Sequence, residues 1–187
     1  MESEAAAIAR MRCGDIGGLE TLVQLFHRPA LKVAYLITHE QASAEDVVQA
    51  TFLRTYERID RFDATRPFGP WFLRCVANDA LATVTRRRHS TLDDDAMANL
   101  HRLADTTADP AVLLATVETR EALWAILAQL TPEQRAAIVA RYYLDLHGAA
   151  LARELAVPAG TVRRRLHDAR GRLRLLLPGW VRQGMND

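Results

Sequence analysis

The feature that most constrains the fold is a pair of helix-forming segments near the end of the chain, separated by a break of three residues. Residues 148–155 (GAALAREL) have the composition of a short helix, and a longer amphipathic helix is expected from Ala159 to about Leu177. Between them, Ala156-Val157-Pro158 interrupts the pattern, because proline lacks the backbone N–H that continues a helix. A short helix, a tight turn and a second helix together predict a helix-turn-helix unit.

The longer helix has an apolar stripe bordered by arginines. At 100° per residue, one narrow stripe is formed by Val162, Leu166, Ala169 and Leu173, and the six arginines of residues 160–177 fall on its flanks and outer face. This pattern is typical of a helix that lies in the major groove of DNA, with phosphates at its flanks and base edges at its early turns. The alternative is compositional bias, because arginine outnumbers lysine 23 to 1 in the whole chain.

The formal net charge of the chain is only +1, but the charge is unevenly distributed. Residues 1–88 carry 12 basic and 11 acidic side chains, residues 89–129 carry 2 and 7, and residues 130–187 carry 10 and 5. Each segment therefore presents its own local field to a partner. The basic final segment fits an acidic partner such as DNA.

The rest of the chain is also expected to be helical, because apolar residues recur at three- and four-residue spacing. Ser43 followed by Glu45 and Asp46 resembles a capped helix start, and Thr131-Pro132 with Gln134 resembles a second one. From residue 89 to residue 109 the periodicity fades and turn-forming and acidic residues dominate. We therefore predict an all-α protein of two small helical domains, residues 1–88 and 110–187, joined by an acidic linker, residues 89–109.

Sites for catalysis, metals or cofactors are not indicated by the sequence. The two cysteines, Cys13 and Cys75, are far apart, and the six histidines do not have metal-ligand spacing. Gly-rich phosphate loops and nucleophile elbows are absent as well. The start MESEAAA is acidic where a signal peptide needs positive charge, and no apolar run approaches the roughly 20 residues that cross a bilayer. We expect a cytoplasmic protein that is not an enzyme, has no cofactor and does not insert into membranes.

Two stretches resemble a known family. The stretch LTPEQRAAIVARYYLDLHGAALARELAVPAGTVRRRLHDARGRLRLLL is similar to region 4 of bacterial sigma factors, and ASAEDVVQATFLRTYERIDRF with PWFLRCVANDAL is similar to region 2. Their order, over about residues 14–177, resembles the extracytoplasmic-function branch (group 4) of the sigma-70 superfamily. The resemblance implies a transcription initiation factor that binds core RNA polymerase, directs it to promoters by reading -35 and -10 elements, and assists strand opening.

The resemblance also implies partners and roles for region 2. A helix beginning near AEDVVQ would dock on the clamp helices of the polymerase β′ subunit, and the candidate contacts are Glu45, Asp46, Gln49 and Arg54. Strand opening needs stacking and polar groups for extruded bases, because unstacking costs a few kcal/mol per base. Asn78 is where the family commonly reads a flipped base, whereas a core position is the favoured alternative for Trp71. The candidates for the -10 element and the single strand are Arg61, Phe62, Phe68, Trp71, Arg74, Asn78, Arg86, Arg87 and Arg88.

Region 4 would read the -35 element with the helix-turn-helix. Thr161, Arg163, Arg164 and His167 are expected to face the groove, because arginine can donate two bonds to guanine. Phosphate contacts are expected from Arg153, Arg165 and Arg170. Further expected partners are the polymerase β subunit and an anti-sigma factor, and the protein would associate with the nucleoid while in the holoenzyme. Two alternatives stay open: a conventional helix-turn-helix repressor or activator that does not depend on polymerase, and a helical interaction module without DNA binding.

Overall fold

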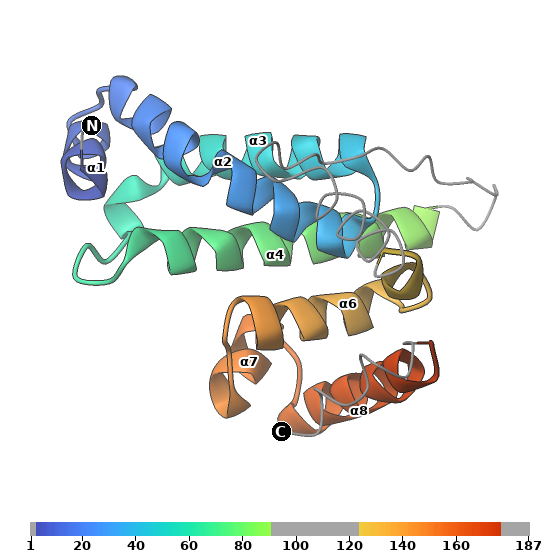
Figure 1. Cartoon of the computed structure of the whole chain (residues 1–187). Helices are drawn as coiled ribbons and strands as arrows, with labels where there is room; N and C mark the ends of the chain where they lie inside the picture. The colour runs from blue at the N-terminus through green and yellow to red at the C-terminus, as the bar shows by residue number, and fades with distance from the viewer. Residues whose placement is uncertain (1–2, 91–123, 177–187) are drawn as a thin grey trace, which may run out of the picture.

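The computed structural model describes residues 3–90 and 124–176, and all regular secondary structure in these two ranges is helical (Figure 1). The all-α fold class is therefore confirmed. We call residues 3–90 the N-terminal half and residues 124–176 the C-terminal half. The elements are α1 (Glu4–Arg12), α2 (Gly17–Thr38), α3 (Gln41–Glu57), the short 3-10 helix η1 (Ile59–Arg61), α4 (Phe68–Ser90), α6 (Pro132–Ile138), the π-helical turn η2 (Val139–Tyr143), α7 (Gly148–Glu154) and α8 (Ala159–Leu176).

The N-terminal half is a helical bundle built around α2, which packs against α1, α3 and α4 (Figure 1). Its centre is formed by fully buried apolar side chains of α2 and α4, which include Leu22, Ile37 and Phe72. Gly18 allows α1 to approach α2 closely, since a Cβ atom at this position would lie 2.3 Å from the Ala7 carbonyl oxygen. Burial of these side chains stabilises the bundle and fixes the orientation of α4, which runs to Ser90.

The start of α3 differs from the sequence expectation. The helix begins at Gln41 with Glu40 as its N-cap, so Ser43 lies inside the first turn and does not cap the helix. The reason is the preceding turn: His39 ends α2 in the left-handed conformation, with φ of 59°, and reverses the chain immediately. The Ser43 hydroxyl instead donates a hydrogen bond to the Glu40 carboxylate. Tertiary geometry thus moved the helix start upstream of the best local capping residue.

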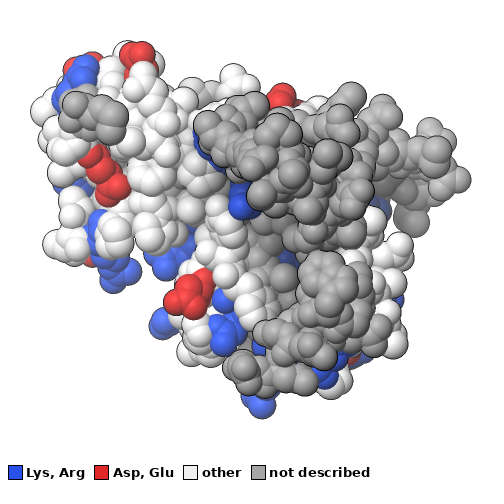
Figure 2. Space-filling model, in the orientation of Figure 1, with Lys and Arg blue, Asp and Glu red and all other residues white. Residues whose placement is uncertain are grey.

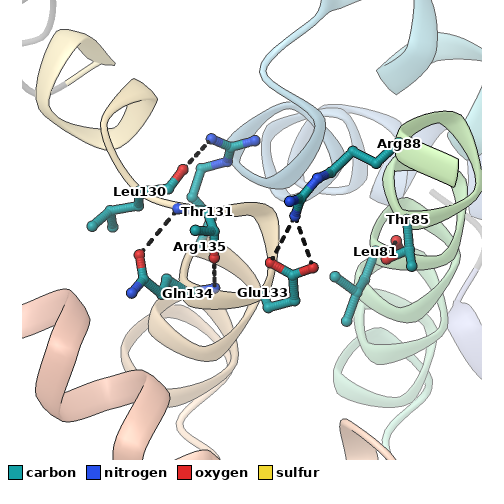
Figure 3. Close-up of polar contacts among 8 residues, drawn as sticks. All are labelled: Leu81, Thr85, Arg88, Leu130, Thr131, Glu133, Gln134 and Arg135. Atoms are coloured by element: carbon teal, nitrogen blue, oxygen red, sulfur yellow. Dashed lines mark hydrogen bonds and ion pairs between the residues drawn. The ribbon is translucent and has the colours of Figure 1, made fainter. Parts of the chain in front are cut away.

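The C-terminal half contains the expected helix-turn-helix, in which α7 is followed by a turn and then by α8. The turn is made at Ala156, which adopts φ of 49° and therefore carries the steric cost of a left-handed conformation that glycine would avoid. The predicted apolar stripe of α8 is confirmed, because all four of its residues are buried. The capping box at Thr131 and Gln134 is confirmed too, and both of its hydrogen bonds are drawn in Figure 3.

The two halves pack against each other along α6, which lies beside α4 and also contacts α2 (Figure 1). Arg135 of α6 is almost fully buried in this domain interface. Its Nε donates to the Ile37 carbonyl at 2.9 Å. An Nη donates to the Leu130 carbonyl at 2.8 Å, as Figure 3 shows. Burial lowers the pKa of Arg135, and the nearby Glu133 opposes that shift. The guanidinium is held by backbone carbonyls near the ends of helical segments, where the helix dipole is negative.

Candidate nucleic-acid and polymerase surfaces

The outer face of α8 is the most exposed cationic surface of the helix-turn-helix. Arg163, Arg164 and His167 are exposed, whereas Thr161 and Arg165 are half-buried beside the apolar stripe. The Arg164 side chain is 86% exposed and its Nε lies 3.8 Å from the Asp168 carboxylate, so this pair is weak and leaves the guanidinium accessible. Arg153, at the end of α7, is exposed as well. The structure therefore brings the predicted groove-facing residues onto one accessible surface.

Arg170 is held in place by Tyr142, a residue that the sequence patterns did not indicate. The Arg170 Nε donates to the Tyr142 hydroxyl at 2.9 Å, and the guanidinium carbons of Arg170 and Arg141 lie 5.7 and 5.8 Å from the centre of the Tyr142 ring. Both distances are within reach of a cation–π attraction. Tyr142 belongs to the π-helical turn η2, and such turns are frequent at functional sites. The only sequence signal was the Arg-Tyr-Tyr run, which does not indicate which helix the aromatic side chains face.

The second candidate surface lies between α3 and α4, beside η1, in the N-terminal half. A cleft of about 300 Å³ is lined by residues that include Arg61, Trp71 and Asn78. Trp71 is half-buried, with one side of its ring system against Phe62 at a centroid separation of 4.8 Å. An indole at the wall of a cleft, with an amide and a guanidinium nearby, can offer stacking and hydrogen bonds to a base.

Two of the predicted stacking residues are not available on this surface. Phe62 is 3% exposed and Phe68 is 0% exposed, and both side chains belong to the hydrophobic core, where Phe68 stacks on Phe72. The rings of Phe62 and Phe68 pack against each other edge to face at 5.4 Å. The expectation that Phe62 and Phe68 contact the single strand is corrected by this burial, since hydrophobic burial is favourable and an extruded base has no access to either ring.

The three arginines at the end of α4 have different surroundings. Arg87 pairs with Glu40 and with the Ser43 hydroxyl inside the N-terminal half. Arg88 reaches across the domain interface to Glu133 at 3.2 Å (Figure 3). Arg86 is exposed on the surface. In this arrangement the charges of Arg87 and Arg88 are partly neutralised within the chain.

The exposed face of α3 carries three of the four predicted polymerase contacts. Glu45, Asp46 and Gln49 are all exposed. Arg54 is directed elsewhere: its two Nη atoms bond the Asp79 carboxylate of α4 at 3.0 and 2.9 Å, and the Thr51 hydroxyl donates to the same carboxylate. This bidentate geometry is a strong form of ion pair and ties α3 to α4.

Comparison with known proteins gives these surfaces a context. Residues 22–90 match the sequence pattern described as Sigma-70 region 2, and residues 120–173 match that of Sigma-70, region 4. The chain belongs to the sigma-70 family of RNA polymerase sigma factors. As a sigma factor it binds core RNA polymerase and promoter DNA and directs transcription initiation at promoters.

Relatives of this sigma factor match it over most of its length. The extracytoplasmic-function sigma factor SigM of Mycobacterium tuberculosis H37Rv is 31% identical over 98% of this chain and 89% of its own length. The extracytoplasmic-function sigma factor SigW of Bacillus subtilis is 25% identical over 89% of this chain and 92% of its own length. These matches span both halves of the molecule and place the chain in the extracytoplasmic-function group of the family.

Two solved structures have a similar fold. One is the sigma factor RpoE from Bartonella quintana in complex with the anti-sigma factor NepR, with a TM-score of 0.63, 18% identity and coverage of 84% of this chain and 94% of that one. The other is CnrH in complex with the cytosolic domain of CnrY, with a TM-score of 0.57, 23% identity and coverage of 94% and 97%. They support the two-part helical architecture of the sigma factor.

Two further side chains of the sigma factor were missed by sequence reasoning. Leu53 is 52% exposed and follows Gln49 by four residues, so it extends the exposed face of α3 with an apolar group. Glu154 lies between the two halves and contacts two -10 candidates, Arg74 and Asn78. Helical spacing from Gln49 could have indicated Leu53, but no local pattern indicates a contact between α7 and α4.

The described residues also bear on metal and thiol chemistry. In these ranges no group of three or more His, Cys, Asp or Glu side chains is arranged to hold a metal ion, and no helix is long and apolar enough to cross a membrane. Cys75 is half-buried at the α4 cleft. Burial, and then the nearby Asp79 and Glu154 carboxylates, raise the pKa of its thiol to about 11, so the thiolate is scarce at neutral pH.

Proposed function

We propose that this sigma factor divides its work between the two predicted domains. Residues 1–88 bind polymerase and act on the -10 element, residues 110–187 read the -35 element, and the acidic residues 89–109 link them. The assignment is supported by the family matches at residues 22–90 and 120–173. The protein acts without catalysing a reaction, resides in the cytoplasm and associates with the nucleoid while it is in the holoenzyme.

For the -35 element, we assign the major-groove contacts to α8. The observation that carries this proposal is the set of exposed arginines above a buried apolar stripe, because the stripe fixes the helix and leaves the guanidinium groups free to bond bases. Thr161, Arg163, Arg164 and His167 face the groove in this assignment. Phosphates are contacted by Arg153, Arg165 and Arg170.

For the -10 element, we assign base capture to the cleft on α4. Trp71 supplies the stacking surface, Asn78 supplies the polar contacts, and Arg61 and Arg74 attract the strand backbone. At the end of the same helix, Arg86 is exposed and would contact the strand directly, whereas Arg87 and Arg88 would do so after leaving Glu40 and Glu133. Opening of the duplex then depends on replacing lost base stacking with these contacts.

For polymerase binding, we assign the exposed face of α3, where Glu45, Asp46 and Gln49 lie together with Leu53. Two carboxylates and an amide beside an apolar side chain form a mixed surface that suits a polar helical partner such as the β′ clamp helices. Arg54 contributes by holding α3 against α4 through Asp79. An anti-sigma factor is a further proposed partner, because the two structurally similar sigma factors were solved in complexes with NepR and CnrY.

The deciding experiment is run-off transcription from a genomic promoter library with purified core polymerase, with and without this protein. We expect protein-dependent transcripts that share two spaced upstream elements. Asp46→Arg should abolish both transcription and co-elution with core polymerase, whereas Glu20→Arg, a matched change at an exposed position of α2, should retain both. Absence of transcripts together with absence of a complex with core polymerase would favour a conventional helix-turn-helix regulator.

A further inference from the structure

The face of α4 that carries Arg74 and Asn78 is covered by the C-terminal half in this structure. The Asn78 Nδ2 donates to the Glu154 Oε1 at 2.8 Å, and the Arg74 Nε lies 3.7 Å from the other Glu154 oxygen. We propose that this face is an interaction surface with two mutually exclusive partners: single-stranded DNA, and Glu154 of the same chain. The proposal rests on the assignment of Asn78 and Arg74 to the -10 element.

The chemistry of Glu154 makes it a competitor for nucleic acid. An ionised carboxylate is an anionic group that only accepts hydrogen bonds, as the phosphate oxygens of a strand do. Asn78 and Arg74 offer donors, and donors engaged by Glu154 are not available to a base or a phosphate. The Glu154 carboxylate therefore partly neutralises Arg74 and occupies the Asn78 amide, and the assignment to the -10 element requires both groups.

The space around this contact is a cleft between the two halves, with a volume of about 510 Å³. Its walls include Arg66 and Trp71 from the N-terminal half and Arg153 from α7. Figure 2 shows basic side chains on both sides of the hollow between the upper and lower parts of the molecule, with acidic side chains beside them. A strand that followed the α4 face would meet α7, so binding requires the halves to separate.

The closed arrangement has independent attachments elsewhere along the domain interface. Arg88 pairs with Glu133 at 3.2 Å, the buried Arg135 bonds the Ile37 carbonyl, and the Lys32 ammonium lies 5.4 Å from the centre of the Tyr143 ring. Buried apolar residues also continue across the interface in one cluster. These contacts hold α7 over α4. Glu154 therefore lies beside Asn78 even if the hydrogen bond between the two side chains is weak.

The consequence is a reduced affinity of the free protein for single-stranded DNA. When only a fraction of the molecules is open, the apparent dissociation constant rises in inverse proportion to that fraction. A partner that binds the separated halves better than the closed ones shifts the population toward the open form. Core polymerase is such a partner if it engages the two halves at separate places.

The first test locks the halves together. In a background with Cys13→Ser and Cys75→Ala, Lys32→Cys and Tyr143→Cys are joined by a short bifunctional maleimide that contains a reducible disulfide. Binding of a fluorescent single-stranded oligonucleotide of mixed sequence is measured by anisotropy before and after reduction. We expect binding to be at least about tenfold weaker in the locked protein than in the same sample after reduction. Equal binding before and after reduction would overturn the proposal.

The second test removes the competing charge in the full chain. Glu154→Gln should bind the same oligonucleotide about threefold to tenfold more tightly than the wild type, because the charge-assisted bonds to the carboxylate are weakened. The matched control is Asp145→Asn, which removes a 91% exposed carboxylate of the same half and keeps a residue that tolerates its left-handed backbone, φ of 51°. An effect of Glu154→Gln no larger than that of Asp145→Asn contradicts the proposal.

Co-elution with core polymerase distinguishes a failure of the Glu154 competition from a failure of the sigma-factor assignment. If every form of the protein fails to bind the oligonucleotide but the wild type still forms a complex with core polymerase, the competition by Glu154 is overturned and the sigma-factor assignment stands. If the complex with core polymerase is also absent, the proposed function fails with it. Stronger binding after reduction and in Glu154→Gln supports the competition directly.

Discussion

Helices α8 and α4 are the two elements to which we assign promoter contacts, and they differ in what covers them. On α8, Arg163 and Arg164 are exposed, and the Arg164 side chain is 86% exposed. On α4, Asn78 and Arg74 are half-buried and engaged by Glu154. The surface that we assign to the -35 element is thus accessible as folded, whereas the surface that we assign to the -10 element is covered by the C-terminal half. Under the proposed assignments, strand capture, rather than duplex reading, is the step that depends on how the two halves are arranged.

The largest expected effect comes from removing the buried guanidinium that joins the halves. Arg135→Ala leaves the Ile37 and Leu130 carbonyls without their donor, and we expect a loss of about 2 to 4 kcal/mol in the free energy of unfolding. Urea denaturation measures this. Arg172→Ala is the matched control, because the exposed Arg172 also donates to a carbonyl, that of Gln129, and should cost less than about 0.5 kcal/mol. Equal losses would show that the domain interface does not depend on Arg135.

The next effect separates base reading from phosphate binding on α8. Arg164→Ala should remove about 1 to 3 kcal/mol of discrimination between the preferred -35 sequence and its variants. Arg170→Ala should weaken binding to all sequences evenly and reduce the slope of log affinity against log salt by about one. A series of promoter variants bound by the holoenzyme measures both. The reverse pattern would reject the assignment of roles to these two arginines.

A pH effect is expected at the domain interface through His39. Burial, and then the nearby Arg135 charge, lower the pKa of His39 in the folded protein. Between the folded and the unfolded pKa the unfolded chain binds more protons, so the free energy of unfolding is greatest above about pH 6.5 and falls as the pH decreases, by at most about 1.4 kcal/mol per pH unit. Urea denaturation between about pH 7.5 and pH 5.5 checks this.

The control for this pH effect is His39→Asn, since asparagine tolerates the left-handed backbone that His39 adopts, φ of 59°. The variant should lose the His39 contribution to the pH dependence. A pH dependence identical to that of the wild type would assign the effect to other groups. His39 packs against Tyr35 and Trp124, so the readout reports on contacts between the two halves.

The smallest expected effect comes from removing the hydroxyl that holds Arg170 in place on the exposed helix α8. Tyr142→Phe keeps the ring below Arg141 and Arg170 but removes the hydroxyl that accepts from Arg170, and we expect duplex binding to weaken about twofold. Tyr143→Phe serves as the control on the neighbouring position and should leave duplex affinity unchanged. Anisotropy with a -35 duplex measures both variants. A larger loss for Tyr143→Phe would contradict the role of Tyr142.

The helices themselves could largely be predicted, because their signals are local. Spacing of apolar residues indicated the stripe of α8, and the Thr131 capping box marked the start of α6. The exposed arginines of the recognition helix followed from the same periodicity, since a residue opposite a buried stripe faces solvent. Within the described residues, the start of α3 was misplaced, because the turn at His39 took precedence over the capping preference of Ser43.

By itself, then, the sequence determined the helical class, the helix-turn-helix and the outward arginines, each of which depends on residues within a few turns of one another. Tertiary structure alone decided that Phe62 and Phe68 are buried, that Arg54 pairs with Asp79, and that Arg135 bonds carbonyls in the domain interface. The contact between Asn78 and Glu154 joins residues 76 positions apart. A helical pattern states which face of a helix is apolar, but the side chain that meets a polar residue depends on how the helices pack.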